Sequence, residues 1–366
     1  MNRELNYFKH LDTLRFVAFF LVFWHHAFAG IVSTIPASEW LKPILHSFSY
    51  TGKTGVNLFF VISGFLITYI LLEERKKTGK IHLKFFYLRR ILRIWPLYFA
   101  FLLVALFVLP LFSDAFQFHG NYFLQLVFLN NYDMEHTSLA VGVAWSVAIE
   151  EQFYIVWPLL LIFIKKPKVL FIASYLLFIV ALTISFQHQD KDEFYTIYNL
   201  HYLFIGTISA QILAHYPNLL LYKIMDKNSI FLSIILSVVF VGISQISEGC
   251  NFISFALLPF CFGHIVLHLA YHTNNAHSSL LSELGKQTYG MYLFHYTLLL
   301  LVSVLVYSQQ WFEYSSGIGK IIIGCCSFVF TVLLAKLSYR YFEQPFLVLK
   351  SNYSVVKTKP QQEQKH

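Results

Sequence analysis

Long apolar runs recur along the whole chain and are separated by short polar stretches. Most contain about 18 or more residues with few charged side chains, the length that an α-helix needs to cross a bilayer. The pattern predicts ten spans, at about residues 12–33, 55–72, 95–112, 144–164, 169–186, 197–214, 230–247, 252–271, 287–308 and 318–338. We therefore expect an all-α fold, a polytopic integral membrane helix bundle.

The composition agrees with this pattern. Of the 366 residues, 57% are apolar and 13% are charged, which is about half the charged fraction of an ordinary soluble domain. This excludes a soluble enzyme, and the 39 Phe and 23 Tyr residues exclude a disordered chain. The four cysteines show neither metal-ligand spacing nor a disulfide framework.

The net charge of +8 is explained by membrane topology. With both termini in the cytoplasm, 23 of the 27 Lys and Arg residues fall in cytoplasmic segments. The remaining four are Lys42, Lys53, Lys191 and Lys320. This asymmetry follows the positive-inside rule and predicts that both termini are cytoplasmic. It also accounts for the basic charge without a nucleic-acid partner, the alternative interpretation of such a chain.

We expect one membrane-embedded domain over residues 1–350. Residues 351–366 are polar and few, which predicts a short disordered tail. The longest external segment, 113–143, contains the apolar stretch 122–129, which we expect to lie on the membrane or dip into it.

The first apolar run also resembles a signal peptide that would be cleaved after Ala29. The charged Arg15 within the run argues against this alternative. So do the bulky residues 24–26, which directly precede the supposed cleavage site.

Ionisable side chains inside the predicted spans are few, and each is costly to insert into a bilayer. Arg15 and His26 are eleven residues apart, which places them on one helical face about 16 Å apart along the axis. Glu150 and Glu151 enter the fourth span from the other end and reach a similar depth to His26. Because a histidine beside a carboxylate is suited to act as a general base, we interpret His26, Glu150 and Glu151 as candidate catalytic residues.

The segment FFYLRRILRIWP, residues 85–96, carries Arg89, Arg90 and Arg93 at the cytoplasmic side. Such a segment is typical of a positive-inside membrane anchor. It is also suited to bind the phosphates of a nucleotide-like cofactor, together with Arg15 at the same membrane face. A guanidinium group can donate two parallel N–H hydrogen bonds to one phosphate. No glycine-rich phosphate loop occurs, so these arginines would have to build any phosphate site.

Four further histidines lie in the last three predicted spans or at their ends. His264, His268 and His272 recur at helical spacing, which could stack metal ligands on one face, but no acidic or cysteine ligand is nearby in the sequence. This favours a polar lining over a metal site, and we expect no metal. For His295, packing and lining of a pathway are both open.

Six blocks of sequence, in this order, resemble those of the acyltransferase 3 family, the integral-membrane acyltransferases that modify cell-surface sugars. The blocks are LDTLRFVAFFLVFWHH (11–26), GVNLFFVISGFLIT (55–68), RRILRIWP (89–96), WSVAIEEQFYIVWPL (145–159), YLFH (292–295) and YRYFEQP (339–345). Together they cover essentially the whole chain, from about residue 6 to 350.

The resemblance implies three pairs of functional residues: Arg15 with His26 in the first block, the cytoplasmic pair Arg90 and Arg93, and the acidic pair Glu150 and Glu151. The sequence departs from the family pattern in two places. His25 stands where the family more often has Tyr, and the second block has Asn57 and Leu58 where small or aromatic residues are common. We expect both departures to bear on the choice of acceptor.

The resemblance further implies an O-acyltransferase of the bacterial inner membrane. It would move an acyl group, usually acetyl, from cytosolic acyl-CoA to a hydroxyl of an exported or lipid-linked glycan. The donor phosphates would bind Arg15, Arg90 and Arg93, and His26 would act as base. Some relatives carry a periplasmic hydrolase-like domain, so we expect this shorter chain to act alone or with a separate periplasmic or envelope partner.

Two other interpretations fit the sequence. In a multi-pass transporter or flippase, Arg15, His26 and Glu150 would form a proton or anion path. The absence of a detectable internal repeat counts against this alternative. A scaffold subunit of an envelope assembly would fit the composition but would leave these polar residues unexplained.

Overall fold

The computed structural model describes residues 7–32, 38–49, 51–188, 194–216, 225–244, 246–272, 279–309 and 317–354. The regular elements of these residues are all helical, which confirms the predicted all-α fold. The ten longer helices are α1 (Lys9–Val32), α3 (Gly52–Thr78), α4 (Leu83–Leu103), α6 (Trp145–Phe163), α7 (Pro167–Gln187), α8 (Leu200–His215), α10 (Lys227–Ile243), α11 (Glu248–Tyr271), α13 (Thr288–Ser308) and α14 (Gly317–Ser338). The shorter α-helices are α2 (Lys42–Ser49), α5 (Tyr122–Leu126), α12 (Leu280–Lys286) and α15 (Gln344–Ser351).

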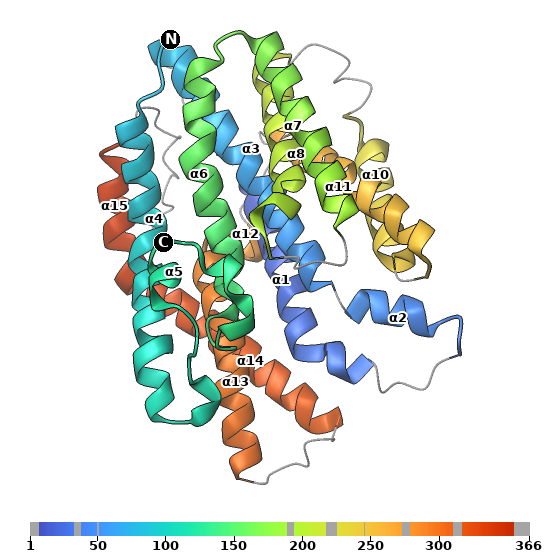
Figure 1. Cartoon of the computed structure of the whole chain (residues 1–366), viewed down its shortest axis with the longest axis vertical. Coiled ribbons are helices and arrows are strands. Elements are labelled where there is room, and N and C mark those ends of the chain that lie inside the picture. Colours follow the sequence, from blue (N-terminus) through green and yellow to red (C-terminus); the bar gives the residue numbers. More distant parts are fainter. Residues whose placement is uncertain are drawn as a thin grey trace.

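Each of the ten predicted spans overlaps one of the longer helices (Figure 1), although α4 begins twelve residues before the predicted span 95–112. Within the described part of the chain, eight helical stretches are long and apolar enough to cross a membrane. The other two, α8 and α10, have 16 and 17 residues and are shorter than a full span. The chain is a polytopic helical membrane protein, as predicted.

Helix α3 lies inside the bundle and packs against both α1 and α8. Two glycines allow a very close approach of α3 to α8. A Cβ atom at Gly64 would collide with the carbonyl oxygen of Leu203, and one at Gly206 would collide with that of Val61. Small residues at such crossings are how membrane helices gain packing contacts without a hydrophobic driving force.

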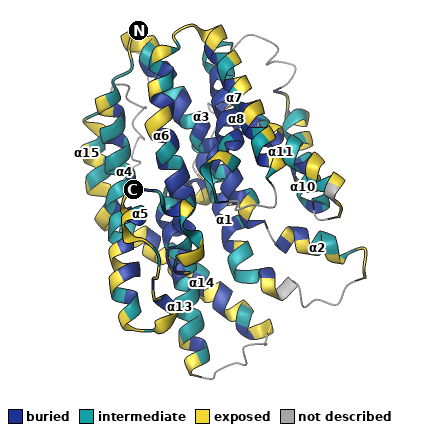
Figure 2. Ribbon diagram, viewed as in Figure 1, coloured by how far each residue is buried: buried dark blue, intermediate teal, exposed yellow. Residues whose placement is uncertain are grey.

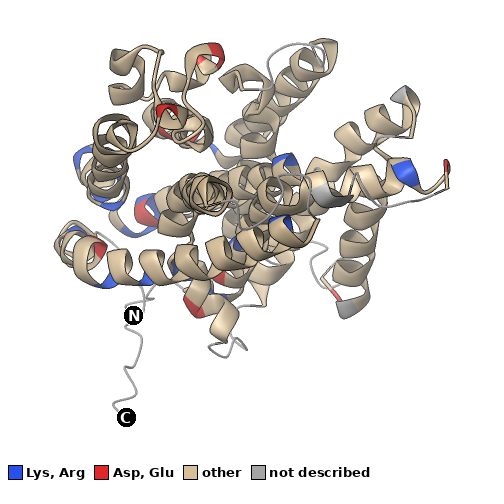
Figure 3. Ribbon diagram, turned by 90° about the horizontal axis from the view of Figure 1, so that it is seen from below, with Lys and Arg blue, Asp and Glu red and all other residues tan. Residues whose placement is uncertain are grey.

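Apolar side chains cover the outside of the bundle as well as its interior. Exposed residues lie on the outward faces of the helices, and buried residues follow the inner helices (Figure 2). Phe107, Leu111 and Phe163 expose 61%, 81% and 81% of their surface. Charged residues are sparse along the helices (Figure 3). An apolar exterior of this kind is suited to contact lipid.

The segment after α4 is tied to the bundle by one aromatic residue. Phe128 is buried, and its ring stacks on Tyr98 with the centroids 4.5 Å apart. Its φ of 58° is uncommon for an aromatic residue, and Gln152 donates a hydrogen bond of 2.8 Å to its carbonyl oxygen. The apolar stretch 122–129 thus combines this buried anchor with exposed side chains such as Phe123.

A π-helical turn, Tyr339–Glu343, connects α14 to α15, which packs against α4 (Figure 1). Arg89 of α4 donates a hydrogen bond of 2.8 Å to the carbonyl oxygen of Tyr353. The first residues of the predicted tail, up to 354, therefore contact the bundle. Residues 355–366 of that tail lie outside the described part of the chain.

Candidate active site

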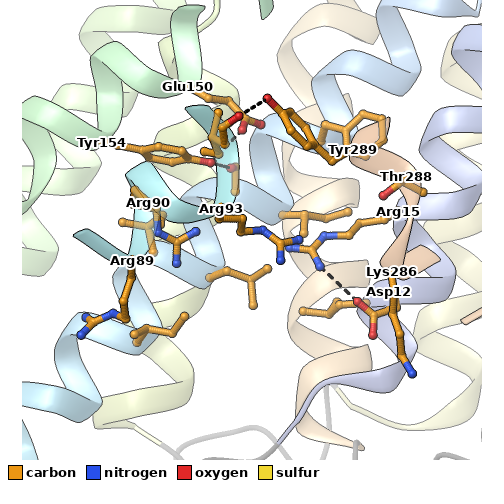
Figure 4. Close-up of a pocket in the computed structure, with 18 of the residues that line it drawn as sticks. Asp12, Arg15, Arg89, Arg90, Arg93, Glu150, Tyr154, Lys286, Thr288 and Tyr289 are labelled. Atoms are coloured by element: carbon orange, nitrogen blue, oxygen red, sulfur yellow. Dashed lines mark hydrogen bonds and ion pairs between the residues drawn. The ribbon is translucent and has the colours of Figure 1, made fainter. Parts of the chain in front are cut away.

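A cavity of about 640 Å³ lies among α1, α3, α4, α6, α13 and α15. Along α3 its lining extends from Glu74 to Phe59, which corresponds to about 22 Å of helix. Four of the six predicted site residues line it: Arg15, Arg90, Arg93 and Glu150 (Figure 4). We refer to this space as the arginine cavity.

Arg15 is held in place by the residues that precede it on α1. Its Nη1 donates to Asp12 Oδ1 at 3.1 Å, and the hydroxyl of Tyr7 donates to Asp12 Oδ2 at 2.5 Å. Burial, together with the Asp12 carboxylate, raises the pKa of Tyr7 well above its usual range. The tyrosine therefore remains a proton donor at neutral pH, and Asp12 stays fixed between the two groups.

Arg90 and Arg93 approach the cavity from α4. Figure 4 shows Arg93 and Arg15 pointing toward one another across the cavity. The guanidinium of Arg90 lies over the rings of Phe86 and Tyr154, 5.7 Å from each centroid. Its buried Nε has no hydrogen-bond partner in the described part of the chain. These cation–π contacts hold the Arg90 guanidinium without neutralising its charge.

Arg89 differs from its two neighbours on α4. Its Nη2 donates to Glu74 Oε2 at 2.8 Å, and both side chains are buried. Glu74 also accepts hydrogen bonds from the backbone N–H and the ring of His82. Arg89 is therefore neutralised by a buried ion pair and contributes to packing, a distinction that the sequence spacing does not reveal.

Lys350 of α15 is a cavity residue that the sequence interpretation missed. It lies close enough to Arg93, Arg90 and Arg15 to be repelled by each of them. Arg90, Arg93 and Lys350 make no ion pair with any residue that the structure describes. The guanidinium groups of Arg90 and Arg93, with the Lys350 amine beside them, give the cavity a basic wall that is suited to bind an anion such as phosphate.

The adjacent acids Glu150 and Glu151 point in different directions from α6. Glu150 lines the arginine cavity and accepts a hydrogen bond of 2.7 Å from the Tyr154 hydroxyl, which is itself hydrogen-bonded to Ser63. Glu151 is buried away from the cavity and accepts a hydrogen bond of 2.9 Å from Nε1 of Trp95. Neighbours on a helix differ by about 100° in direction, and of these two acids only Glu150 lines the cavity.

His26 has a different partner from the one we expected. Its Nδ1 lies 2.9 Å from Nε2 of His295 on α13, and neither Glu150 nor Glu151 forms a hydrogen bond with it among the described residues. The expectation of a carboxylate partner rested on equal depth in the membrane. Depth does not determine which helix neighbours which, and α13 supplies the side chain beside His26.

The contacts of this histidine pair determine its tautomers when both rings are neutral. His295 Nδ1 lies 2.7 Å from the carbonyl oxygen of Tyr292, which can only accept, so this nitrogen carries the proton. The unprotonated Nε2 of His295 then accepts a hydrogen bond from Nδ1–H of His26. Nε2 of His26 is left with a free lone pair, which is the state that a general base requires.

Tyr292 separates the histidine pair from the arginine cavity. Its hydroxyl shares a hydrogen bond of 2.7 Å with Ser146, and both residues line the cavity. The ring centroid of Tyr292 is 5.6 Å from that of His295, which lies about one helical turn further along α13. The histidine pair is therefore adjacent to the cavity, behind this tyrosine.

The three histidines of α11 hydrogen-bond to the protein. His264 pairs with the Ser233 hydroxyl at 2.8 Å, and His268 and His272 contact carbonyl oxygens of residues 226 and 225. The described residues contain no cluster of three or more His, Cys, Asp or Glu side chains that could hold a metal. These contacts match the polar-lining interpretation.

Comparisons with known proteins agree with the sequence blocks. The model of a family described as "Acyltransferase domain" matches residues 8–340. The O-acetyltransferase OatA of Staphylococcus aureus strain NCTC 8325 / PS 47 is 28% identical over 362 residues, which cover 87% of this chain and 55% of that protein. OatA of strains COL and MRSA252 match equally well. The chain thus spans about half the length of these relatives, and no solved structure matches significantly.

Proposed function

The chain belongs to the acyltransferase 3 family, and from this membership we propose that it is a membrane O-acetyltransferase. Its donor would be cytosolic acetyl-CoA, and its acceptor a hydroxyl of an exported or lipid-linked cell-surface glycan. The proposal is supported by the names of its relatives, which are O-acetyltransferases, and by the chemistry of the arginine cavity.

The observation that carries the proposal is the set of unneutralised cations in the arginine cavity. Coenzyme A carries several phosphate charges at one end and a thioester at the end of a long, uncharged arm. Arg90 and Arg93 offer the charge that the phosphates need, Arg15 adds a third guanidinium beside Arg93, and the Lys350 amine lies next to them. The cavity volume of about 640 Å³ is in the range that holds a cofactor-sized ligand.

The arm of the donor would extend along α3 toward Glu150 and Tyr292. Glu150 can accept hydrogen bonds from the amide groups of that arm, which makes it a positioning group for the thioester. Tyr292 closes this end of the cavity, on the side of the histidine pair. A rotation of its side chain would open a path by which the acyl group could reach His26.

The transfer itself needs a base at the acceptor hydroxyl. Nε2 of His26 would take the proton as the hydroxyl oxygen attacks the acyl carbon, so that the C–O bond forms and the C–S bond breaks. The departing thiolate then receives the proton from His26. His295 would stabilise the transient imidazolium through its hydrogen bond to Nδ1 of His26.

The positive-inside topology would place the arginine cavity at the cytoplasmic face, where acetyl-CoA is available. The acceptor would then reach His26 from the opposite side of the bacterial inner membrane. The protein would act alone or with a separate envelope partner.

Release of CoA from acetyl-CoA by the purified protein, with a crude surface-glycan extract as acceptor, tests this proposal. We expect glycan-dependent release and an increase of about 42 Da for each acetylated sugar. A transporter or flippase would release no CoA, and that result would overturn the proposal. A His26→Ala protein serves as the inactive reference.

A further inference from the structure

A second cavity, of about 390 Å³, lies at the opposite end of α1 and α3 from the arginine cavity. On α3 it is lined by Lys53, Thr54 and Asn57, whereas the arginine cavity begins at Phe59. The remaining walls come from α7, α8, α10 and α11. We refer to this space as the outer cavity, because the predicted topology places it on the external side.

Two buried side chains in the outer cavity carry polar atoms without a partner. His201 is 1% exposed, and neither of its ring nitrogens forms a hydrogen bond with a residue that the structure describes. Asn57 is 4% exposed, and its Oδ1 has no partner among those residues either. Leaving a buried polar group unpaired is costly, and such groups need an explanation such as a missing ligand.

The chemistry of these groups matches a sugar. A neutral imidazole offers one N–H donor and one acceptor nitrogen, so His201 can bind two hydroxyl groups, and Asn57 Oδ1 can accept from a third. The rings of Tyr202 and Phe255 lie 4.2 Å and 4.9 Å from that of His201 and add apolar surface. Lining residues within the described chain include no Asp or Glu, so a neutral or acidic sugar meets no repulsion.

The outer cavity lies next to the proposed base but is not lined by it. His25 lines the cavity, and the His25 ring centroid is 5.1 Å from that of His26. Asn57 and His25, which come from α3 and α1, thus line the same cavity.

We propose that the outer cavity binds a sugar ring of the acceptor glycan. His201 and Asn57 would bind its hydroxyl groups, and His25 lies at the end of the cavity nearest to His26. This inference rests on the proposed O-acetyltransferase function. It assigns acceptor recognition to α3 and α8, on the other side of His26 from the donor.

The test replaces the unpaired polar groups by apolar groups of similar size, His201→Phe and Asn57→Leu. The purified full-length protein is assayed in proteoliposomes with radiolabelled acetyl-CoA and a crude surface-glycan extract. For each variant, KM is measured for glycan and for acetyl-CoA, and the thermal midpoint is measured in detergent. His264→Phe, a histidine of α11 outside both cavities, is the matched control.

We expect the KM for glycan to rise about tenfold or more in both variants, because each loses hydrogen bonds to the acceptor. The KM for acetyl-CoA should not change. The thermal midpoint of His201→Phe should stay equal or rise, because an unpaired buried polar group is replaced by an apolar one. The midpoint of Asn57→Leu should fall slightly, because this change also removes the hydrogen bond between the Asn57 side chain and Tyr202. A purely structural role of His201 would instead lower its midpoint, and a purely structural role of either residue would leave the KM for glycan unchanged.

An unchanged KM for glycan in the folded variants overturns this inference alone, provided that the wild type transfers acetyl groups. If His201→Phe does not fold, Asn57→Leu decides the question. A wild-type protein that releases no CoA with glycan overturns the proposed function, and this inference falls with it.

Discussion

His26 and His295 form a hydrogen bond of 2.9 Å between Nδ1 of the first and Nε2 of the second, although 269 positions separate them in the chain. The carbonyl of Tyr292 fixes the tautomer of His295, and His295 fixes that of His26. The two rings therefore act as one unit, with the free lone pair on Nε2 of His26 at its end.

We expect His26→Ala and His295→Ala each to lower kcat for acetyl transfer by about 10² to 10⁴, the usual contribution of general-base catalysis. The KM for acetyl-CoA should change little, because neither residue lines the arginine cavity. Because the two rings act together, the double variant should be no slower than the slower single variant.

Steady-state kinetics of the three proteins check this expectation, with His264→Ala as a control for loss of an intramembrane histidine. Fully additive losses in the double variant would contradict a single unit. A folded His26→Ala protein that retains more than about a tenth of wild-type transfer would exclude His26 as the base.

Arg93→Lys and Arg90→Lys should each raise the KM for acetyl-CoA about tenfold to a hundredfold, because a charge-assisted hydrogen bond contributes roughly 1.5–3 kcal/mol and an ammonium cannot form a fork. The charge of the cavity is unchanged, so an anchor that acts only through charge would tolerate lysine. Arg340→Lys, an exposed arginine outside the arginine cavity, is the control. If the variants are present at wild-type levels and their KM for acetyl-CoA is unchanged, phosphate binding by these arginines is refuted.

Glu150→Gln should reduce transfer more than about tenfold, because an amide in place of the carboxylate weakens charge-assisted hydrogen bonds to the donor. Glu151→Gln should have a smaller effect, because its oxygen can still accept from Trp95 and the side chain lies outside the cavity. Parallel assays of the two isosteric variants compare these neighbours directly. A stronger loss in Glu151→Gln would reverse the assignment.

Gly206→Ala should lower the free energy of unfolding by about 1–3 kcal/mol, because the new methyl group meets the carbonyl of Val61 where α8 crosses α3. Gly242→Ala is the matched control. It adds the same methyl group to α10, where the nearest atoms, in the Phe48 ring, lie at an ordinary 3.5 Å. Thermal unfolding in detergent measures the difference, and equal midpoints for both variants would contradict the close α3–α8 contact.

A cysteine at position 80, Lys80→Cys, should react with an impermeant thiol reagent only after the membrane is opened, because the charge asymmetry places this exposed loop in the cytoplasm. Glu39→Cys, before α2, should react in intact cells. Both are made in a background in which the four native cysteines are serine. Labelling of residue 80 in intact cells would show that the predicted topology is inverted. The assignment of the two cavities to the two sides of the membrane would then be inverted as well.

The fold could be predicted from the sequence because membrane spans are marked by the length of an apolar run. Each predicted span overlaps a helix, and the helical spacing of Arg90 and Arg93 correctly placed both on one face. The three arginines Arg15, Arg90 and Arg93 line one cavity, which agrees with a predicted topology that places all three at the same membrane face. Such local arguments need only the period and direction of each helix.

The partners of individual side chains could not be predicted in the same way. A single sequence gives the depth of His26 and Glu150, but it does not say that α13 is the neighbour of α1 at that depth. Lys350 was missed for a related reason, since a lysine beside a polar tail resembles a simple anchor until α15 is seen to pack on α4. Interhelical geometry, which sets both contacts, depends on packing across the whole bundle.

The arginine cavity draws Arg15 from α1 and Lys350 from α15, near opposite ends of the described chain. During biosynthesis, α1 leaves the ribosome long before α15 does. A growing chain can therefore insert most of its helices while the arginine cavity is still incomplete. If this cavity holds the donor, as we propose, that capacity arises only once α15 has docked on α4, and assembly of the bundle would precede the chemistry.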